Sequence, residues 1–157
     1  MPRVETSVIV PVTAEVAFAV SQTQGEVRYR WDNFVRRQQL LHGAERPEAG
    51  VQTETKSKHG LTMVSEYTSF KPPSQVGMKM VTGPPFFARF AAGWSFKDLG
   101  NGTTEATWRY TFKIKPAFLA PIGDRIGRWY LGRDIRKRIA GYAKGCEDPA
   151  VLAAIKQ

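Results

Sequence analysis

The sequence predicts an α+β domain in which a curved antiparallel sheet of about seven strands wraps around one long C-terminal helix. Residues 105–114 alternate between apolar and polar side chains, which is typical of a strand with one buried face. An Asn101–Gly102 turn joins this run to a second alternating run at 87–98, so the two are expected to form a hairpin. After Pro116 the apolar residues recur every three to five positions, as in an amphipathic helix. Strands followed by a terminal helix favour helices packed on one face of the sheet.

The remaining elements follow in order along the chain. A segment rich in β-branched residues at 4–12 predicts the first strand. Thr13 is expected to cap a short helix, and 27–35 predicts a second short helix or turn. Gly145 is expected to end the long helix that begins near Pro121. Further extended segments are predicted at about 36–42, 50–58, 61–70, 76–82, 87–98 and 103–115.

Length, charge and cysteine content restrict the class of protein. The 157 residues predict a single domain over 1–157, with its core at about 4–146 and a tail at 147–157. Lysine and arginine exceed the acids by 23 to 14, which favours anionic partners. Cys146 is the single cysteine, and His42 and His59 have no third ligand at metal-site spacing, so neither a metal nor a cofactor is expected. Without a recognisable signal peptide or membrane-spanning run, a cytoplasmic location is expected.

Several segments together resemble one known fold superfamily. They are the opening "VETSVIVPVTAEVAFAV", the early "WDNF", the strand "MVSEYTSFKPP" with its double-proline turn, and the hairpin "GWSFKDLGNGTTEATWRYTFKIKP". Over about residues 4–146 the chain resembles the polyketide cyclase and START-related (SRPBCC) superfamily, whose helix-grip fold is shared by the birch pollen allergen. The resemblance implies a largely apolar cavity between sheet and helix. It implies no single activity, because members of the superfamily bind very different molecules.

The candidate ligand-binding residues are apolar or aromatic and lie on the predicted inner faces. Methionine adapts to irregular or changing contents, which favours open space beside the central strands. The same rings would equally fill a solid core, and Phe86 and Phe87 would either gate an opening or plug the end of the sheet. The candidates are Trp31, Phe34, Met63, Tyr67, Met78, Met80, Phe87, Phe90, Trp94, Trp108, Tyr110, Ile126, Trp129 and Tyr130.

Catalytic motifs are mostly absent, and the weak candidates for acid–base chemistry are Glu66, Tyr67 and Arg109. The strand at 61–70 carries apolar residues on both parities, so its pattern leaves open whether Tyr67 or Glu66 faces inward. A surface pair across two strands is the favoured interpretation for Glu66. The charges of the "RYRWD" segment, on Arg28, Arg30 and Asp32, are expected to be solvated.

The leading hypothesis is binding of a small hydrophobic ligand, such as a lipid, an isoprenoid or a polyketide-like molecule. An anionic head group and peripheral contact with an acidic membrane would suit the basic charge. The alternative is a polyketide cyclase, aromatase or dehydratase, so the sequence leaves enzymatic activity open. Least favoured is nucleic-acid or protein binding through the five cations of 132–145, and no nucleic-acid partner is expected. The protein is expected to be a monomer, or a homodimer if "VQTETKSK" forms an exposed edge strand.

Overall fold

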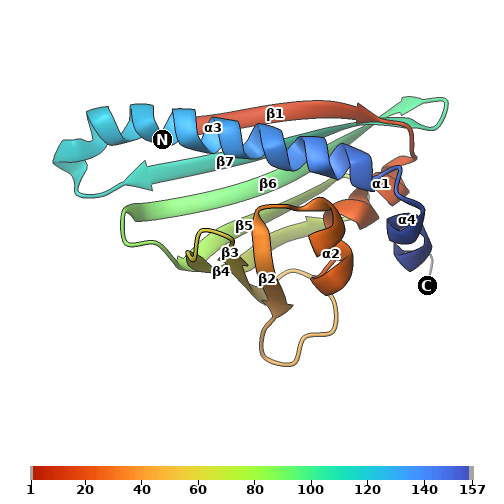
Figure 1. Ribbon diagram of the computed structural model, residues 1–157, viewed down its shortest axis with the longest axis horizontal. Coiled ribbons are helices and arrows are strands. Elements are labelled where there is room, and N and C mark those ends of the chain that lie inside the picture. The colour runs from red at the N-terminus through yellow and green to blue at the C-terminus, as the bar shows by residue number, and fades with distance from the viewer. Residues whose placement is uncertain (1, 156–157) are drawn as a thin grey trace.

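The computed structural model describes residues 2–155 and has the predicted architecture: a curled antiparallel sheet with a long helix lying across its concave face (Figure 1). The strand order is β1-β7-β6-β5-β4-β3-β2. The strands are β1 (Arg3–Val10), β2 (Val35–Leu40), β3 (Gln52–Ser57), β4 (Thr62–Lys71), β5 (Gln75–Thr82), β6 (Phe87–Gly100) and β7 (Thr103–Ile114). The helices are α1 (Ala14–Ser21), α2 (Gly25–Trp31), the 3-10 turn η1 (Ala117–Leu119), α3 (Ala120–Gly145) and α4 (Pro149–Ile155).

The β6–β7 hairpin confirms the pairing that was predicted from the two alternating runs. Asn101 and Gly102 both have positive φ at its tip, as a tight hairpin turn requires. Trp94 lies opposite Trp108 in the register, and their rings stack with centroids 4.2 Å apart. The inner face of this hairpin therefore carries stacked aromatic rings that face the interior of the domain.

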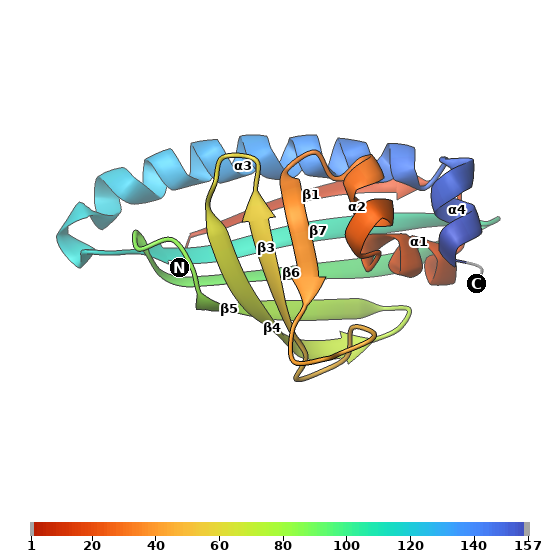
Figure 2. The same ribbon diagram turned by 60° about the horizontal axis from the view of Figure 1, so that its bottom comes forward.

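The long helix α3 packs along β1 and β7, and its C-terminal half closes one end of the curled sheet (Figure 2). Ile135, Ile139 and Tyr142 are buried there, and the ring of Tyr142 lies 4.7 Å from that of Trp94. Glycine permits the closest approaches of the helix. A Cβ on Gly127 would lie 2.6 Å from the ring of Phe112, so a larger residue there would push α3 away from the sheet.

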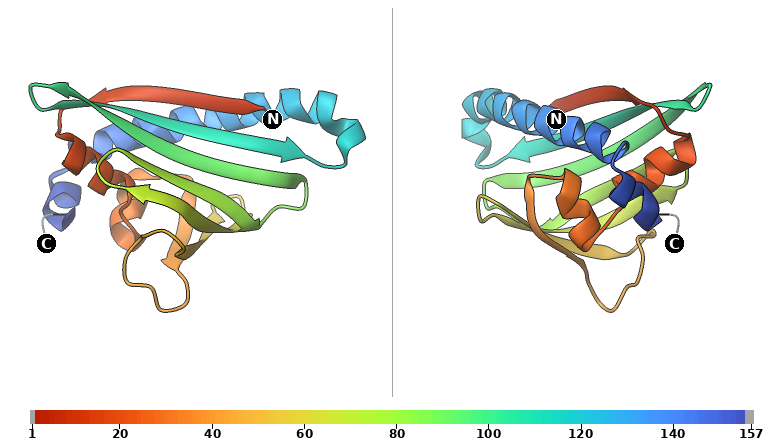
Figure 3. Two further views of the ribbon diagram at one scale, coloured as in Figure 1. Left: turned by 180° about the vertical axis from the view of Figure 1, so that it is seen from behind. Right: turned by 45° about the vertical axis from the view of Figure 1, so that its right-hand side comes forward.

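Helices α1 and α2 lie together at the end of the sheet where α3 finishes (Figure 3). Thr13 caps α1 as predicted, accepting a hydrogen bond from the amide of Val16. The residues after 146, expected as a tail, include α4, which packs against α1 and α2 and buries Val151.

The segment "VQTETKSK" is not an edge strand, so the condition under which a homodimer was considered is not met. Its strand β3 is hydrogen-bonded on both sides, to β2 and to β4. The edges of the sheet are β1 and β2.

Candidate ligand cavity

A cavity of about 390 Å³ lies between the sheet and α3. This volume falls within the range of small-molecule sites in proteins. Its walls come from strands β2 to β7, from the end of α1, from α2, and from α3 between Gly123 and Arg138. Leu61, Phe86, Ile126 and Tyr130 line the cavity and are also exposed to solvent, so they mark its mouth. The mouth therefore opens beside the first turns of α3, whereas α2 lies toward the other end of that helix (Figure 2).

The cavity brings together eleven of the fourteen side chains that were predicted to line it, so the aromatic rings leave open space rather than a solid core. Of the phenylalanine pair, Phe87 is buried in the wall and Phe86 is exposed at the mouth. The eleven are Phe34, Met63, Tyr67, Met78, Phe87, Phe90, Trp94, Trp108, Tyr110, Ile126 and Tyr130.

Three predicted residues lie outside the cavity. Trp31 is buried behind it, packs edge-on against Tyr142 and donates a hydrogen bond to the Thr23 hydroxyl. Met80 is half-buried near Gly83, at the end of β5. Trp129 is exposed on the outer side of α3, because the sheet covers only the opposite side of the helix, where Gly127 and Leu131 lie.

Of the three weak catalytic candidates, Tyr67 points into the cavity, and Glu66 and Arg109 point away from it. Tyr67 lines the cavity, and its hydroxyl donates to Gln22 at 3.0 Å. Burial raises the pKa of Tyr67 to about 12, so this phenol stays protonated at neutral pH. Glu66 instead points outward and lies 3.8 Å from Lys79 on β5, which is the favoured surface pair. Arg109 also lies outside the cavity, where it donates to Glu5.

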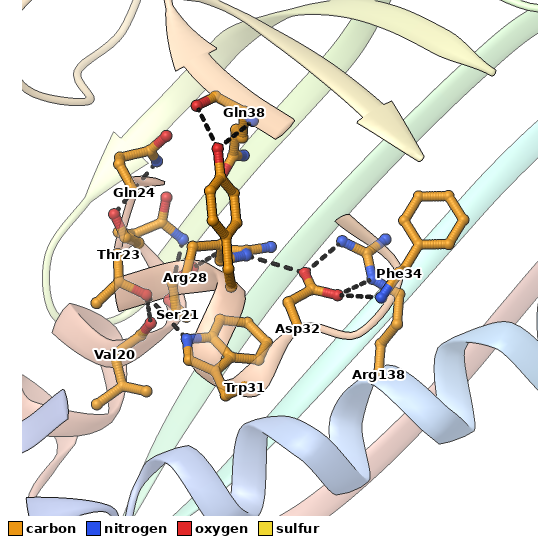
Figure 4. A network of polar contacts seen from close by, with 12 residues as sticks. Val20, Ser21, Thr23, Gln24, Arg28, Trp31, Asp32, Phe34, Gln38 and Arg138 are labelled. Atoms are coloured by element: carbon orange, nitrogen blue, oxygen red, sulfur yellow. Dashed lines mark hydrogen bonds and ion pairs between the residues drawn. The ribbon is translucent and has the colours of Figure 1, made fainter. Parts of the chain in front are cut away.

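A buried network of charges at the C-terminal end of α2 forms the polar end of the cavity, and Figure 4 shows its members Arg28, Asp32 and Arg138. Asp32 is fully buried and accepts hydrogen bonds from two arginines, Arg28 at 2.9 Å and Arg138 at 2.8 and 3.1 Å. Arg28 also donates to the Ser21 carbonyl at 2.6 Å. Both arginines line the cavity, while Asp32 lies behind them. Two guanidinium groups therefore line this end of the cavity, and the Asp32 carboxylate that they share lies behind them, away from the cavity.

Aromatic rings hold both arginines in place. The guanidinium of Arg28 lies 4.3 Å from the ring of Trp31, and that of Arg138 lies 4.3 Å from Trp108 and 4.5 Å from Phe34. Such contacts favour a cation that has lost its water. Burial alone would raise the pKa of Asp32, but the charges and hydrogen bonds of Arg138 and Arg28 outweigh it and hold that pKa at about 2.

A second carboxyl group, Asp134, lines the cavity one turn before Arg138. The hydroxyl of Tyr110 donates to it at 3.3 Å and itself accepts a hydrogen bond from Arg138. Burial raises the pKa of Asp134, although the charge of Arg138 opposes this rise. Asp134, Tyr110 and Arg138 therefore form a chain of hydrogen-bonded groups in the cavity wall.

The sequence interpretation of the "RYRWD" segment is wrong for Arg28 and Asp32, which are buried, and correct for Arg30, which is exposed and pairs with Asp148. A signal was available, because Arg28 and Asp32 are four residues apart, as in a helical ion pair, and flank the apolar Trp31. Nothing in the helical charge pattern distinguished Arg138 from the other cations of 132–145.

Within residues 2–155, no three of the His, Cys, Asp and Glu side chains are grouped to hold a metal ion. No helix in this range combines the length and apolar character needed to cross a bilayer.

Comparison with known proteins places the chain in a family. Residues 1–147 match the family model described as polyketide cyclase / dehydrase and lipid transport. The chain belongs to this family. None of the curated proteins matches it in sequence.

Solved structures agree on the fold at low sequence identity. The protein TTHA0849 from Thermus thermophilus is similar with a TM-score of 0.75 and 13% identity, over 98% of this chain and 99% of that protein. A START superfamily protein from Mycobacterium smegmatis is similar with a TM-score of 0.70 and 16% identity, over 92% of this chain and 98% of that protein. The di-domain ARO/CYC protein BexL from the BE-7585A biosynthetic pathway is also similar, with a TM-score of 0.74 and 13% identity. The match covers 94% of this chain and 47% of BexL. These likenesses support the helix-grip fold alone.

Proposed function

We propose that the protein binds a small, elongated hydrophobic molecule with an anionic end in the cavity between the sheet and α3. The observation that carries this proposal is the pair of buried guanidinium groups at one end of a largely apolar cavity. A lipid, an isoprenoid acid or a polyketide-like acid would fit this description. The family's description includes lipid transport and polyketide cyclases, which is compatible with each of these ligands.

The cavity gives such a ligand a direction. Arg28, Gln38 and Tyr67 lie at the closed end, whereas Phe86 and Ile126 lie at the mouth. Among the described residues none accepts a hydrogen bond from Nη2 of Arg28, and Oε1 of Gln38 is buried without a partner. Of these two groups, the Nη2 donor is the one that a carboxylate head group would satisfy, because a carboxylate only accepts hydrogen bonds. A carboxylate is therefore proposed to lie next to Arg28, with its apolar chain directed toward the mouth.

The proposal is tested by comparing dodecanoate with dodecanol in calorimetric titrations of the same protein. The two probes share a chain, but only the first brings an anion to Arg28. Dodecanoate is expected to bind at one molecule per chain and about tenfold or more tightly, because a hydrogen bond to a charged group is worth more than a neutral one. Equal affinities would refute the anionic end, and no binding of either would refute the cavity.

A matched pair of variants on β6 locates the binding site. Ala92 lines the cavity, whereas Ala91 is the next residue of the strand and its side chain lies on the other face. Ala92→Trp is expected to abolish dodecanoate binding by filling the cavity, and Ala91→Trp is expected to retain it. If both variants bind alike, the ligand lies elsewhere.

A second candidate function is an enzyme of the cyclase, aromatase or dehydratase type. It is favoured by one observation, the carboxyl group of Asp134 with a raised pKa beside the Tyr110 hydroxyl in the cavity wall. Asp134 would move a proton while the cavity holds the substrate in a reactive shape. Molecules extracted from wild type and from Asp134→Asn distinguish the two functions. A carrier holds the same species in both, and an enzyme holds an unconverted precursor in the variant.

The cytoplasmic location and the choice between monomer and homodimer stay predictions.

A further inference from the structure

The first half of α3 exposes a stripe of large apolar side chains that the sheet does not cover. Phe118 is 80% exposed, Ile122 65%, Ile126 61% and Trp129 64%. Ile122, Ile126 and Trp129 follow one another at steps of four and three residues, and Tyr130 is four residues after Ile126, so these side chains share one face of the helix. We define this apolar stripe by the exposed side chains Phe118, Leu119, Ile122, Ile126, Trp129 and Tyr130.

The apolar stripe is continuous with the mouth of the cavity. Ile126 and Tyr130 belong to both, and the exposed ring of Phe86 lies at the mouth. The light-blue first turns of α3 lie at one end of the molecule, away from α1, α2 and α4 (Figure 1). A flat partner could therefore contact the stripe and the mouth together.

Cations lie beside the apolar stripe and favour a partner with a negative charge. Arg125, Arg128 and Arg133 are exposed between and beside its members, and Arg133 lies 5.9 Å from the ring of Trp129. Between residues 115 and 133 there are four cations and one acid, Asp124. Tryptophan, tyrosine and long cationic side chains are the residues that settle at the boundary between lipid headgroups and acyl chains.

We propose that this face docks the mouth of the cavity onto an anionic phospholipid surface, with the first half of α3 lying in the interface plane. The apolar stripe enters the acyl boundary, and the three arginines contact the headgroup phosphates. The inference rests on the proposed function, because it gives an apolar ligand a route between bilayer and cavity that avoids water. A second copy of the chain is a poorer occupant, since a symmetric contact would bring two like-charged faces together.

Tryptophan fluorescence tests the docking without any label. Of the four tryptophans, Trp31, Trp94 and Trp108 are buried, whereas Trp129 is exposed. On mixing with vesicles of phosphatidylcholine and phosphatidylglycerol, the emission is expected to shift to the blue. The shift is expected to vanish in Trp129→Phe and to weaken with salt, because exposed charges are screened. A shift of equal size with pure phosphatidylcholine would overturn the role of the arginines.

Co-sedimentation with the same vesicles measures affinity in matched variants. Ile122 and Trp129 do not line the cavity, so Ile122→Ser with Trp129→Ser removes two large side chains from the apolar stripe and leaves the ligand site intact. This double variant is expected to bind vesicles at least about tenfold more weakly, because each lost side chain would have buried apolar area in the bilayer. The control is Ile9→Ser, which removes an equally exposed isoleucine from β1 and is expected to bind as wild type does.

Dodecanoate titrations of the same proteins separate the two proposals. Wild type that binds dodecanoate but no vesicle overturns the docking and leaves the proposed function standing. Wild type that binds vesicles but neither dodecanoate nor dodecanol refutes the proposed function instead. If light scattering shows a dimer that the double variant abolishes, the apolar stripe is a self-interface and the membrane assignment is wrong.

Discussion

Replacing Asp32 by asparagine probes the buried charge network with the smallest possible change in shape. Asp32 is fully buried and neutralises two arginines that are themselves buried. The amide keeps one acceptor oxygen but removes the charge and turns an NH₂ group toward the guanidinium donors. The variant therefore leaves two cations in the interior with no counter-charge, which costs much more than losing a surface pair.

The pKa of Asp32 gives the magnitude. It lies at about 2, against an ordinary value of 3.8. At about 1.36 kcal/mol per pKa unit, the charge of Asp32 stabilises the folded protein by roughly 2.5 kcal/mol. The misplaced NH₂ group adds to this loss, so Asp32→Asn is expected to lower the free energy of unfolding by about 3–4 kcal/mol. For a chain of this length, the melting temperature should fall by roughly 6–16 °C.

Thermal and urea unfolding at pH 7 measure the effect, and Glu66→Gln is the control. Glu66 and Lys79 are largely solvated, so breaking their pair should cost less than about 1 kcal/mol. Because the folded-state pKa of Asp32 is lowered, its stabilisation is complete above about pH 4 and is lost as the pH falls toward 2. The reasoning is refuted if Asp32→Asn costs no more than Glu66→Gln at pH 7.

Four further predictions concern stability and reactivity. Asp134→Asn should raise the melting temperature at pH 7, opposite in sign to Asp32→Asn, because burial raises the pKa of Asp134 and its charge is unfavourable in the fold. Gly132→Ala should stabilise α3 by up to about 1 kcal/mol, because a Cβ there meets only the flexible end of Arg136 and Val4. Gly141→Ala should destabilise it by at least about 1 kcal/mol in the same urea titrations, since its Cβ would collide with the Trp31 carbonyl oxygen. Cys146, buried and with its pKa raised to about 11, should react with Ellman's reagent at pH 8 only after unfolding.

Local patterns were sufficient to predict the fold, because each element carries its own periodicity. The β6–β7 hairpin follows from two alternating runs and a turn in which Asn101 and Gly102 tolerate positive φ. Most of the cavity wall follows from the same alternation, since residues of one parity on neighbouring strands share a face. The orientation of β4 did not follow, because both of its faces carry apolar residues, and the pairing with β5 places Glu66 outside.

The polar end of the cavity depends on contacts between distant segments, which periodicity does not report. Arg28 and Asp32 come from α2 and its C-terminal end, but their burial depends on Arg138, more than a hundred residues later. Trp129 shows the opposite error. Its spacing is that of a buried stripe, but it lies on the side of α3 that faces away from the sheet, so the side chain lies in solvent. Both errors occur where the covering element, rather than the local pattern, decides burial.

A crystal structure of the protein with dodecanoate tests the central claim most directly. We expect one dodecanoate molecule between the sheet and α3, with its carboxylate within hydrogen-bond distance of Arg28 and its chain pointing toward Phe86. An interior closed by the aromatic rings, with dodecanoate absent or bound only at the surface, would contradict the account.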